Sequence, residues 1–245
     1  MRYFGLIGYP LSHSFSKAYF NQKFEQEGIP AQYENYPIPS IEEFPELLRR
    51  HPSLEGINVT IPYKEAVLPY LHSVSEVVGK TGACNCIRIR NGRLEGFNTD
   101  VLGFEKSLLK SLQPRHDRAL VLGTGGASKA VQFVLDKLRI PFTVISRSAD
   151  PAAGILSYAE LNTELQHNSR LWINTTPLGM HPNIDSCPPL DYAQLGSDHY
   201  LYDLVYNPAE TLFLKKGKER GAITENGHDM LLIQAEEGWK IWNAD

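Results

Sequence analysis

A glycine-rich segment between a predicted strand and a predicted helix constrains the fold more than any other feature of this sequence. The segment, Gly123-Thr124-Gly125-Gly126-Ala127, follows the apolar run 119–122 and precedes the stretch 128–138, whose apolar residues recur at helical spacing. Gly123 permits a tight turn, and Gly125 lets the backbone approach a ligand phosphate. The start of the helix then offers free N–H groups to an anion. This pattern is typical of a dinucleotide site, although a glycine-rich turn without a ligand is the alternative.

The residues after the next predicted strand, 142–145, indicate which dinucleotide is bound. An NAD site usually has an acidic residue here, which binds the ribose 2′-hydroxyl. This chain instead has Arg147, flanked by Ser146 and Ser148. A guanidinium binds phosphate through paired hydrogen bonds, and the serines add donors. We therefore expect NADP, the alternative being that Arg147 is a solvated surface residue.

Strand-like and helix-like segments alternate along most of the chain, which predicts an α/β protein with parallel sheets. Asn91-Gly92 is the strongest hairpin signal, and Ser40 with Glu43 forms a potential capping box. Strands are expected at 3–7, 32–36, 56–60, 84–90, 93–97, 119–122, 142–145, 171–173 and 200–204. Helices are expected at 16–27, from 40 toward 50, after 63 to 71, and at 101–112, 128–138 and 230–242. We predict two domains, 1–101 and 102–227, with a C-terminal helix, 228–245, that packs back on the first.

Composition excludes several classes of function. The hydrophobic content of 42% and charged content of 21% are ordinary for a soluble globular protein. A net charge of −4 argues against a nucleic-acid partner, and no apolar run approaches the roughly 18 residues of a membrane span. Three cysteines and no secretory signal favour reduced thiols in a cytoplasm. No metal site is predicted, because Cys84 and Cys86 lack a second ligand cluster. We expect a small-molecule partner, and a monomer or homodimer.

Three further segments identify a family. They are Gly8-Tyr9-Pro10-Leu11-Ser12-His13-Ser14-Phe15-Ser16, Asn58-Val59-Thr60-Ile61-Pro62-Tyr63-Lys64 and Asn98-Thr99-Asp100. Together with the ordered segments 82–85, 174–180, 202–208 and 227–235, they resemble shikimate dehydrogenases. The resemblance implies an N-terminal α/β substrate domain, a Rossmann-like NADP domain and an active site in the interdomain cleft. It also implies the reversible NADPH-dependent reduction of 3-dehydroshikimate to shikimate in the chorismate pathway to aromatic amino acids.

The resemblance assigns catalysis to Lys64, with Asp100 as its partner. Reducing a ketone requires a hydride at carbon and a proton at oxygen, and a cation beside the oxygen stabilises the developing alkoxide. A nearby carboxylate would orient the ammonium, while burial would lower its pKa. The alternatives are an ordinary first-turn lysine and an N-cap for the helix expected at 101–112.

The resemblance also assigns the binding residues. Ser14 and Ser16 match the family's binders of the substrate carboxylate, although they could instead cap the following helix. His13 is expected to make only a structural hydrogen bond. The other predicted substrate contacts are Thr60, Asn85, Thr99, Gln234 and Tyr206. The predicted cofactor contacts are Gly123, Gly125, Gly126, Ala127, Ser146, Arg147, Ser148, Thr175, Met180 and Gly227.

The sequence departs from the family pattern at two places and leaves two rival functions open. Lys17 stands where a proline is common, and Asp150 stands where some NADP-specific members have a second basic residue. One rival is a quinate/shikimate dehydrogenase paralogue, against whose NAD-using form Arg147 argues. The other is a non-catalytic NADP- or shikimate-binding protein, against which the presence of both Lys64 and Asp100 argues.

Overall fold

A computed structural model describes residues 1–11 and 14–244 of the chain. The chain forms two compact units: an N-terminal unit, Met1–Thr99 with the residues from Gln234 onward, and a second unit, Asp100–Ile233. The helix α8 (His228–Asn243) is therefore divided between them at Gln234, whereas the sequence analysis assigned all of 228–245 to the first domain. His13 lies outside the described residues. The roles of the two units as substrate and cofactor domains remain predictions.

The N-terminal unit is built on a six-stranded sheet in the order β2-β1-β3-β5-β6-β4. The strands β1, β2 and β3 are parallel, and β5 runs antiparallel to both β3 and β6. The strands are β1 (Arg2–Gly8), β2 (Ala31–Pro37), β3 (Leu54–Val59), β4 (Ser73–Val74), β5 (Cys86–Arg90) and β6 (Arg93–Phe97). The helices are α1 (Phe15–Gln26), α2 (Phe44–Arg50) and α3 (Glu76–Thr81), with 3-10 turns η1 (Ile41–Glu43) and η2 (Leu68–Tyr70).

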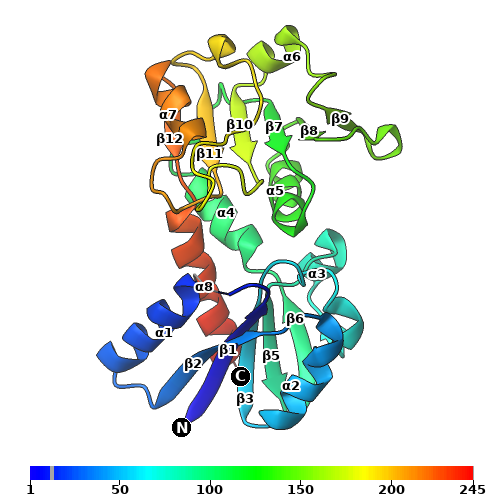
Figure 1. The fold of residues 1–245 in the computed structure, drawn as a ribbon, viewed down its shortest axis with the longest axis vertical. Helices are drawn as coiled ribbons and strands as arrows, with labels where there is room; N and C mark the ends of the chain where they lie inside the picture. The colour runs from blue at the N-terminus through cyan, green and yellow to red at the C-terminus, as the bar shows by residue number, and fades with distance from the viewer. Residues whose placement is uncertain (12–13, 245) are drawn as a thin grey trace. The chain divides into compact units, whose positions relative to one another are not determined.

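Helices cover both faces of this sheet (Figure 1). Alternate side chains of β1 divide between two apolar clusters: Phe4 and Leu6 pack with α1 and α8, and Ile7 packs with α2. Trp242 of α8 stacks on Phe4 with ring centroids 4.9 Å apart, and its indole N–H donates to the carbonyl of Ile87 at 3.0 Å. These contacts attach the end of the chain to the first sheet.

The second unit has a six-stranded, fully parallel sheet in the order β12-β11-β10-β7-β8-β9. The strands are β7 (Ala119–Leu122), β8 (Phe142–Ser146), β9 (Ile155–Ser157), β10 (Leu171–Asn174), β11 (Tyr200–Asp203) and β12 (Ile223–Glu225). The helices are α4 (Asp100–Leu108), α5 (Gly126–Lys137), α6 (Thr163–Asn168) and α7 (Leu212–Glu219), with 3-10 turns η3 (Pro151–Ala153) and η4 (Tyr192–Gln194). The strand order reverses between β7 and β10, and ligands of open α/β sheets bind at the carboxyl ends of the strands at such a point.

The α/β fold with two sheets is confirmed, and most predicted elements lie within two residues of the observed ones. Parallel sheets were predicted, but only the second sheet is fully parallel, because the strands of the β5–β6 hairpin make the first sheet mixed. The Asn91-Gly92 turn is confirmed as well, since both residues have positive φ, 50° and 73°, as the tight turn between β5 and β6 requires. The elements absent from the prediction are short or lie at sheet edges: β4, α3, β9, α6, α7 and β12.

Three local predictions were wrong. Ser40 does not cap a helix; its hydroxyl bonds the nearby carboxylate of Glu42, and a 3-10 turn precedes α2. The chain after Tyr63 forms turns and η2 rather than a continuous helix, and Pro69 in that stretch disfavours a regular helix. The helix expected at 101–112 is α4, which ends at Leu108.

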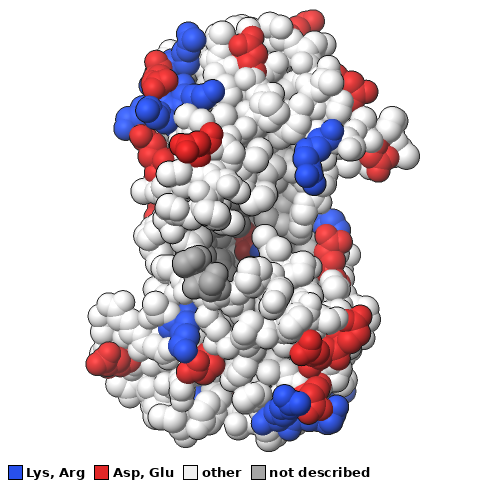
Figure 2. Space-filling model, viewed as in Figure 1, with Lys and Arg blue, Asp and Glu red and all other residues white. Residues whose placement is uncertain are grey.

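No helix among the described residues is long and apolar enough to cross a membrane. On the face shown in Figure 2, acidic and basic side chains are interspersed, and no extended surface of one sign is visible. The distribution agrees with the modest net charge of −4.

Candidate active site and cofactor site

Three predicted substrate contacts, Asn85, Thr99 and Gln234, form one hydrogen-bonded cluster in the N-terminal unit. The Asn85 amide donates to the Thr99 hydroxyl at 3.0 Å and accepts from the Thr99 backbone N–H at 2.7 Å. The Gln234 side-chain oxygen lies 3.5 Å from the Asn85 Nδ2 and 3.4 Å from the Thr99 hydroxyl. Asn85 and Thr99 are almost fully buried. The cluster therefore brings together amide and hydroxyl groups, which are able to form hydrogen bonds with the hydroxyl groups of a ligand.

A chain of hydrogen bonds through buried polar side chains holds the backbone at Asn85. The Asn85 carbonyl accepts from the Val59 N–H at 2.9 Å and from the Asn58 amide at 3.2 Å. Asn58 in turn accepts from the Tyr33 hydroxyl at 2.8 Å, and Tyr33 is hydrogen-bonded to Ser16. Burial raises the pKa of Tyr33 well above its ordinary value, so that its phenol stays protonated as a donor. This chain of hydrogen bonds connects the predicted carboxylate binder Ser16 with Asn85 through side chains that sequence reasoning did not select.

Lys64 lies in a turn whose backbone is held at several points. Its carbonyl accepts from the Cys84 N–H at 2.7 Å, directly before Asn85. The preceding Tyr63 is buried, and its hydroxyl donates to the Ile38 carbonyl at 2.6 Å. At the start of the turn, the N–H of Thr60 donates to the carbonyl of Ile7 at 2.9 Å. The backbone at Lys64 is thus fixed beside Asn85, and the lysine side chain is half-buried.

Asp100 directly follows Thr99 of the cluster and is the first residue of α4. It is 6% exposed, and a carboxylate in the first turn of a helix is stabilised by the helix dipole. The alternative in which Asp100 is the N-cap that precedes this helix is not observed, because Asp100 is itself the first helical residue.

Ser14 stands before the first residue of α1, but its side chain does not cap the helix. Its hydroxyl oxygen is buried and makes no hydrogen bond to any residue that the structure describes. Buried hydroxyls are normally hydrogen-bonded. A ligand carboxylate would supply the acceptor that this hydroxyl otherwise lacks, and the capping alternative is wrong for Ser14.

The turn after β7 requires glycine at its first position. Gly123 has a φ of +113°, and a side chain there would lie 2.6 Å from the Thr175 hydroxyl. Its carbonyl accepts from the hydroxyl of Ser128 at 2.7 Å, and Ser128 accepts from Gln132 at 2.9 Å. Ser128 occupies the place of the third glycine of the usual fingerprint. Its buried hydroxyl replaces that glycine with a hydrogen bond that anchors the turn.

Gly125 has no comparable reason within the protein to be glycine. Its φ of −75° is available to any residue, and a side chain there would meet no protein atom within 4 Å. Gly125 precedes α5, whose first N–H groups at Gly126 and Ala127 lack partners within the helix. The open space at Gly125 would let a ligand phosphate approach these amides, as it does in dinucleotide sites with this glycine pattern.

Arg147 follows β8 directly and is exposed, between Ser146 at the strand end and Ser148. The guanidinium is therefore available to a ligand at the carboxyl edge of the sheet. Asp150 has a local role instead: its carboxylate accepts from the N–H of Ala153 at 3.3 Å and caps η3. The acidic residue in this loop is thus partly engaged in shaping the turn after Arg147.

The loops after β10 and β11 carry the remaining predicted cofactor contacts and Tyr206. The Thr175 hydroxyl donates to the carbonyl of Leu122 at 2.7 Å, at the base of the glycine turn. Met180 is 43% exposed, and burial raises the pKa of the half-buried Tyr206. At Gly227, a side chain would collide with the backbone of Leu204, so the close approach of two chain segments requires glycine there.

Sequence reasoning missed the residues that join these loops. Asp203 at the end of β11 is 0% exposed and accepts hydrogen bonds from Asn174, Thr211 and the N–H of Val205. Burial raises its pKa from 3.8 to about 6, which the three hydrogen bonds partly oppose. Both motifs that contain Asn174 and Asp203 were visible in the sequence, but neither side chain was assigned a role.

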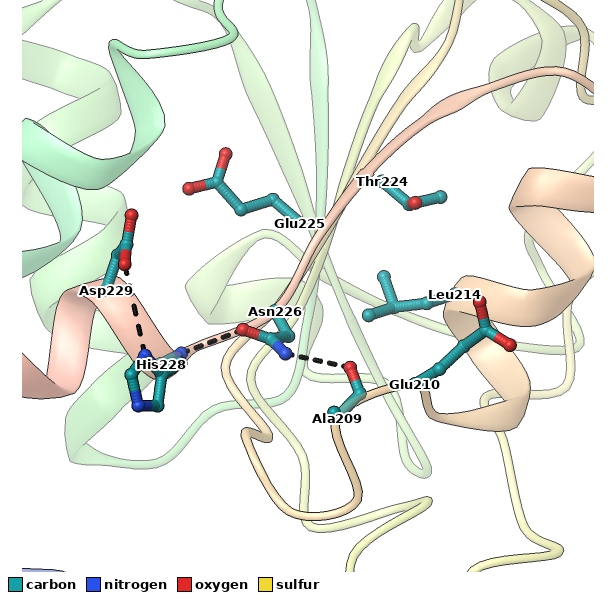
Figure 3. Close-up of a pocket in the computed structure, with 8 residues that line it drawn as sticks. All are labelled: Ala209, Glu210, Leu214, Thr224, Glu225, Asn226, His228 and Asp229. Atoms are coloured by element: carbon teal, nitrogen blue, oxygen red, sulfur yellow. Dashed lines mark hydrogen bonds and ion pairs between the residues drawn. The ribbon is translucent and has the colours of Figure 1, made fainter.

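A separate polar pocket of about 390 Å³ lies where β12 meets α8 (Figure 3). Asn226 donates to the carbonyl of Ala209 at 2.8 Å and accepts from the N–H of His228 at 3.0 Å, so it ties the loop before α7 to the start of α8. None of the predicted site residues lines this pocket. In the part of the chain that the structure describes, no group of three or more His, Cys, Asp or Glu residues is arranged to hold a metal ion.

The fold and this site define a class of protein: an α/β protein whose second unit has the strand order and glycine turn of a Rossmann-type dinucleotide-binding domain. Residues 6–87 match the family model described as the shikimate dehydrogenase substrate binding domain. The shikimate dehydrogenase (NADP(+)) of Halothermothrix orenii is 37% identical over 265 residues, which cover 98% of this chain and 90% of that protein. The chain belongs to the shikimate dehydrogenase family, and the predicted resemblance is confirmed.

Solved structures agree along the whole chain. Shikimate 5-dehydrogenase from Thermus thermophilus, in complex with NADP(H) and shikimate, superposes with a TM-score of 0.89 at 32% identity, covering 100% of this chain and 94% of that one. Quinate dehydrogenase from Corynebacterium glutamicum, in complex with NAD, superposes with a TM-score of 0.88 at 27% identity, again covering 100% and 94%. The fold is therefore shared by relatives with different substrates and cofactors.

Proposed function

We propose that this protein is an NADP-dependent shikimate dehydrogenase that reversibly reduces 3-dehydroshikimate to shikimate. The observation that carries the proposal is the hydrogen-bonded cluster of Asn85, Thr99 and Gln234, whose Asn85 follows Cys84, the residue that donates its N–H to the Lys64 carbonyl. Shikimate has three ring hydroxyls, and the cluster presents amide and hydroxyl groups that bind such groups. The relatives named above support the same activity.

In the proposed mechanism, Lys64 acts on the substrate oxygen. Its ammonium stabilises negative charge that develops on the carbonyl oxygen and donates the proton during reduction; in the reverse direction the amine accepts it. Asp100 orients the ammonium and balances its charge. Ser14 and Ser16 bind the carboxylate of the substrate, with Tyr206 near it, while Thr60, Asn85, Thr99 and Gln234 bind its hydroxyls.

NADPH, when bound, supplies the hydride, and the second unit offers groups that fit it. The amides of Gly126 and Ala127 would bind the pyrophosphate below the open space at Gly125. Arg147, with Ser146 and Ser148, would bind the 2′-phosphate of the adenosine ribose. Thr175, Met180 and Gly227 would border the nicotinamide, beside the turn at Gly123.

The pathway and the compartment complete the proposal. The reaction belongs to the biosynthesis of chorismate and the aromatic amino acids, as the family resemblance implies. Cys84, Cys86 and Cys187 are free thiols, which favours a reducing compartment such as the cytoplasm. We expect the enzyme to act as a monomer or homodimer.

A second candidate is a quinate dehydrogenase, because a relative that is named so shares the fold. Quinate carries an additional hydroxyl on the ring carbon that bears the carboxylate, so the region of Ser14 and Ser16 would have to accommodate it. The exposed Arg147 after β8 favours a 2′-phosphate and therefore NADP over the NAD of that relative. A non-catalytic binding protein is disfavoured because Lys64 and Asp100 are both present.

The test is nicotinamide absorbance of the purified protein with shikimate or quinate, each with NADP⁺ or NAD⁺. Rapid reduction of NADP⁺ by shikimate, well above that of NAD⁺, is the expected result. Faster reduction of NAD⁺ with quinate would assign the protein to the second candidate. Binding of the cofactor without turnover of either substrate would leave only a binding protein.

A further inference from the structure

The carboxyl edge of the second sheet contains a buried carboxylate that the proposed mechanism does not use. Asp203 is 0% exposed, and among the described residues no lysine or arginine forms an ion pair with it. An unpaired buried carboxylate is unfavourable unless hydrogen bonds compensate it. Three donors do so here, and each comes from a different segment of the chain: Asn174 at 2.9 Å, the Val205 N–H at 3.0 Å and the Thr211 hydroxyl at 2.6 Å.

One side of this arrangement extends into the loop after β10. The Asn174 amide that donates to Asp203 also lies 3.3 Å from the carbonyl of Leu178. The Asn174 oxygen accepts from both the N–H and the hydroxyl of Thr176, at 3.0 and 2.6 Å. Asn174 is therefore hydrogen-bonded both to the Asp203 carboxylate and to the segment between Thr175 and Met180, and it fixes one relative to the other.

The other side extends into the loop between β11 and α7. The Val205 N–H donates to one Asp203 oxygen, immediately before Tyr206. The Thr211 hydroxyl donates to the other oxygen and accepts from the N–H of Leu214 as the N-cap of α7. Both ends of the loop 204–211 are thus held by the same carboxylate.

The network reaches the glycine turn as well. The N–H and hydroxyl of Thr175 both donate to the carbonyl of Leu122, at 2.9 and 2.7 Å. Leu122 directly precedes Gly123, whose carbonyl Ser128 anchors. A continuous set of contacts therefore joins α5, β7, β10, β11 and α7 along the edge where the cofactor is proposed to bind.

We propose that Asp203 is a positioning residue for the cofactor site, which holds the loops after β10 and β11 in the geometry that presents Thr175, Met180 and Tyr206. The inference rests on the proposed function, because it assigns those loops to the nicotinamide and the substrate carboxylate. Asp203 itself touches neither ligand; it acts through Asn174, Thr211 and the backbone of Val205.

The chemistry of the site requires a carboxylate rather than an amide. An ionised carboxylate only accepts hydrogen bonds, and all three of its neighbours donate. In Asp203→Asn, the new NH₂ group faces either the two N–H donors of Asn174 and Val205, or Thr211, whose hydroxyl must then accept from it and can no longer donate to this side chain. The substitution preserves the volume of the side chain while breaking one arm of the network.

The experiment compares Asp203→Asn with the wild-type enzyme in steady-state kinetics and in equilibrium binding. We expect kcat/KM to fall about 10- to 100-fold, with a raised KM for NADPH and a smaller loss of shikimate affinity, because Tyr206 is the one residue of these loops proposed to lie near the substrate. Leu195→Ala is the matched control, because it creates a cavity in the apolar cluster of the second unit without touching the network. It should lower the melting temperature and leave both kinetic constants nearly unchanged.

Two further variants separate positioning from general weakening. Thr211→Ser keeps the donor and should retain activity, whereas Thr211→Val should resemble Asp203→Asn. The double variant with Asn174→Ala and Asp203→Asn should lose little more than the worse single variant, because both changes break one connection. Additive losses, unchanged kinetics of Asp203→Asn, or equal losses in Leu195→Ala would each overturn the proposal.

Failure of the proposed function remains distinguishable. If the wild-type protein does not oxidise shikimate with NADP⁺, the proposed function fails, and the fluorescence of bound NADPH then serves as the readout. Weaker NADPH binding by Asp203→Asn than by the wild type and by Leu195→Ala would still support the positioning role. Equal affinities in all three proteins would overturn it.

Discussion

The two units arrange polar groups for recognition in different ways. The N-terminal unit uses side chains, and its cluster joins residues as far as 149 positions apart, Asn85 and Gln234. The second unit uses the backbone of a glycine turn, the start of α5 and loops tied to one buried carboxylate, Asp203. The difference follows from the proposed ligands. Side-chain amides and hydroxyls suit the hydroxyls of a small ring, whereas backbone amides and a helix start suit a phosphate.

The largest effect is expected at Lys64, through which the N-terminal unit is proposed to take part in proton transfer as well as in binding. Lys64→Met removes the ammonium from the substrate oxygen, so kcat should fall about 10²–10⁴-fold with a modest change in KM. Stopped-flow and steady-state absorbance of NADPH measure it. A kcat within a few fold of the wild type would remove Lys64 from the mechanism.

The next test contrasts two glycines of the same turn. Gly123→Ala forces a side chain into positive φ beside the Thr175 hydroxyl and should lower the free energy of unfolding by about 2–4 kcal/mol. Gly125→Ala should change stability by less than about 1 kcal/mol, because the position is open, yet weaken NADPH binding. Denaturant titration and NADPH titration separate the two. Full NADPH affinity in Gly125→Ala would mean that no phosphate approaches that backbone.

Arg147 tests the single side chain that the second unit is proposed to use for selectivity. Arg147→Ala should weaken NADPH binding about 10- to 100-fold, the value of charge-assisted hydrogen bonds, and leave NADH binding nearly unchanged. Because the residue is exposed, the melting temperature should not move. The Asp150→Ala variant is a useful control on the same loop. Equal losses with both cofactors would show that Arg147 does not contact the 2′-phosphate.

The smallest expected effect is a pH dependence in which two buried groups of the second unit oppose each other. Burial raises the pKa of Asp203 from 3.8 to about 6. As pH falls, this carboxyl is therefore protonated in the folded protein before it is protonated in the unfolded chain. Its protonation stabilises the folded state by up to about 3 kcal/mol as pH falls through 6 toward 4. The charge of Asp203 in turn helps to raise the pKa of Tyr192 and of Tyr202, after the larger effect of their own burial. Burial lowers the pKa of His116 from 6.5 to about 4, so the unfolded chain binds that proton first, and stability is lost over the same range.

Single variants should separate these opposing contributions in acid unfolding curves. Asp203→Asn removes the group that stabilises the folded state at low pH, so its acid midpoint should lie at higher pH than that of the wild type. His116→Gln removes the opposing group, so its midpoint should lie at lower pH. Identical midpoints in all three proteins would contradict both assignments.

Local sequence was sufficient where the chemistry is local. The glycine turn and the Asn91-Gly92 hairpin were predictable because positive φ at these positions selects glycine or asparagine. The strands of the second sheet were predictable from short apolar runs, since parallel strands are buried on both faces. Prediction failed at Ser40 and after Tyr63, where a nearby carboxylate and a proline outweighed the helical pattern.

The candidate site shows the same division. The motifs made Lys64, Asp100, Asn85 and Arg147 predictable as residue types, but no local pattern indicates that Asn85 and Gln234 share a hydrogen-bonded cluster. Asp203 was overlooked because nothing in the sequence of the strand predicted at 200–204 shows that the carboxylate within it has hydrogen-bond donors. Its burial and its three donors come from segments that only the folded sheet brings together.

The sequence by itself determined the fold class, the family and the dinucleotide turn, and it predicted NADP as the cofactor, because each depends on residue types at fixed spacing. The tertiary structure decided which side chains support them: Tyr33 and Asn58 beneath Asn85, Ser128 beneath Gly123, and Asp203 between two loops. The physical reason is burial. A polar group removed from water must find its partner wherever the packed chain supplies one, and distance along the sequence does not limit that choice.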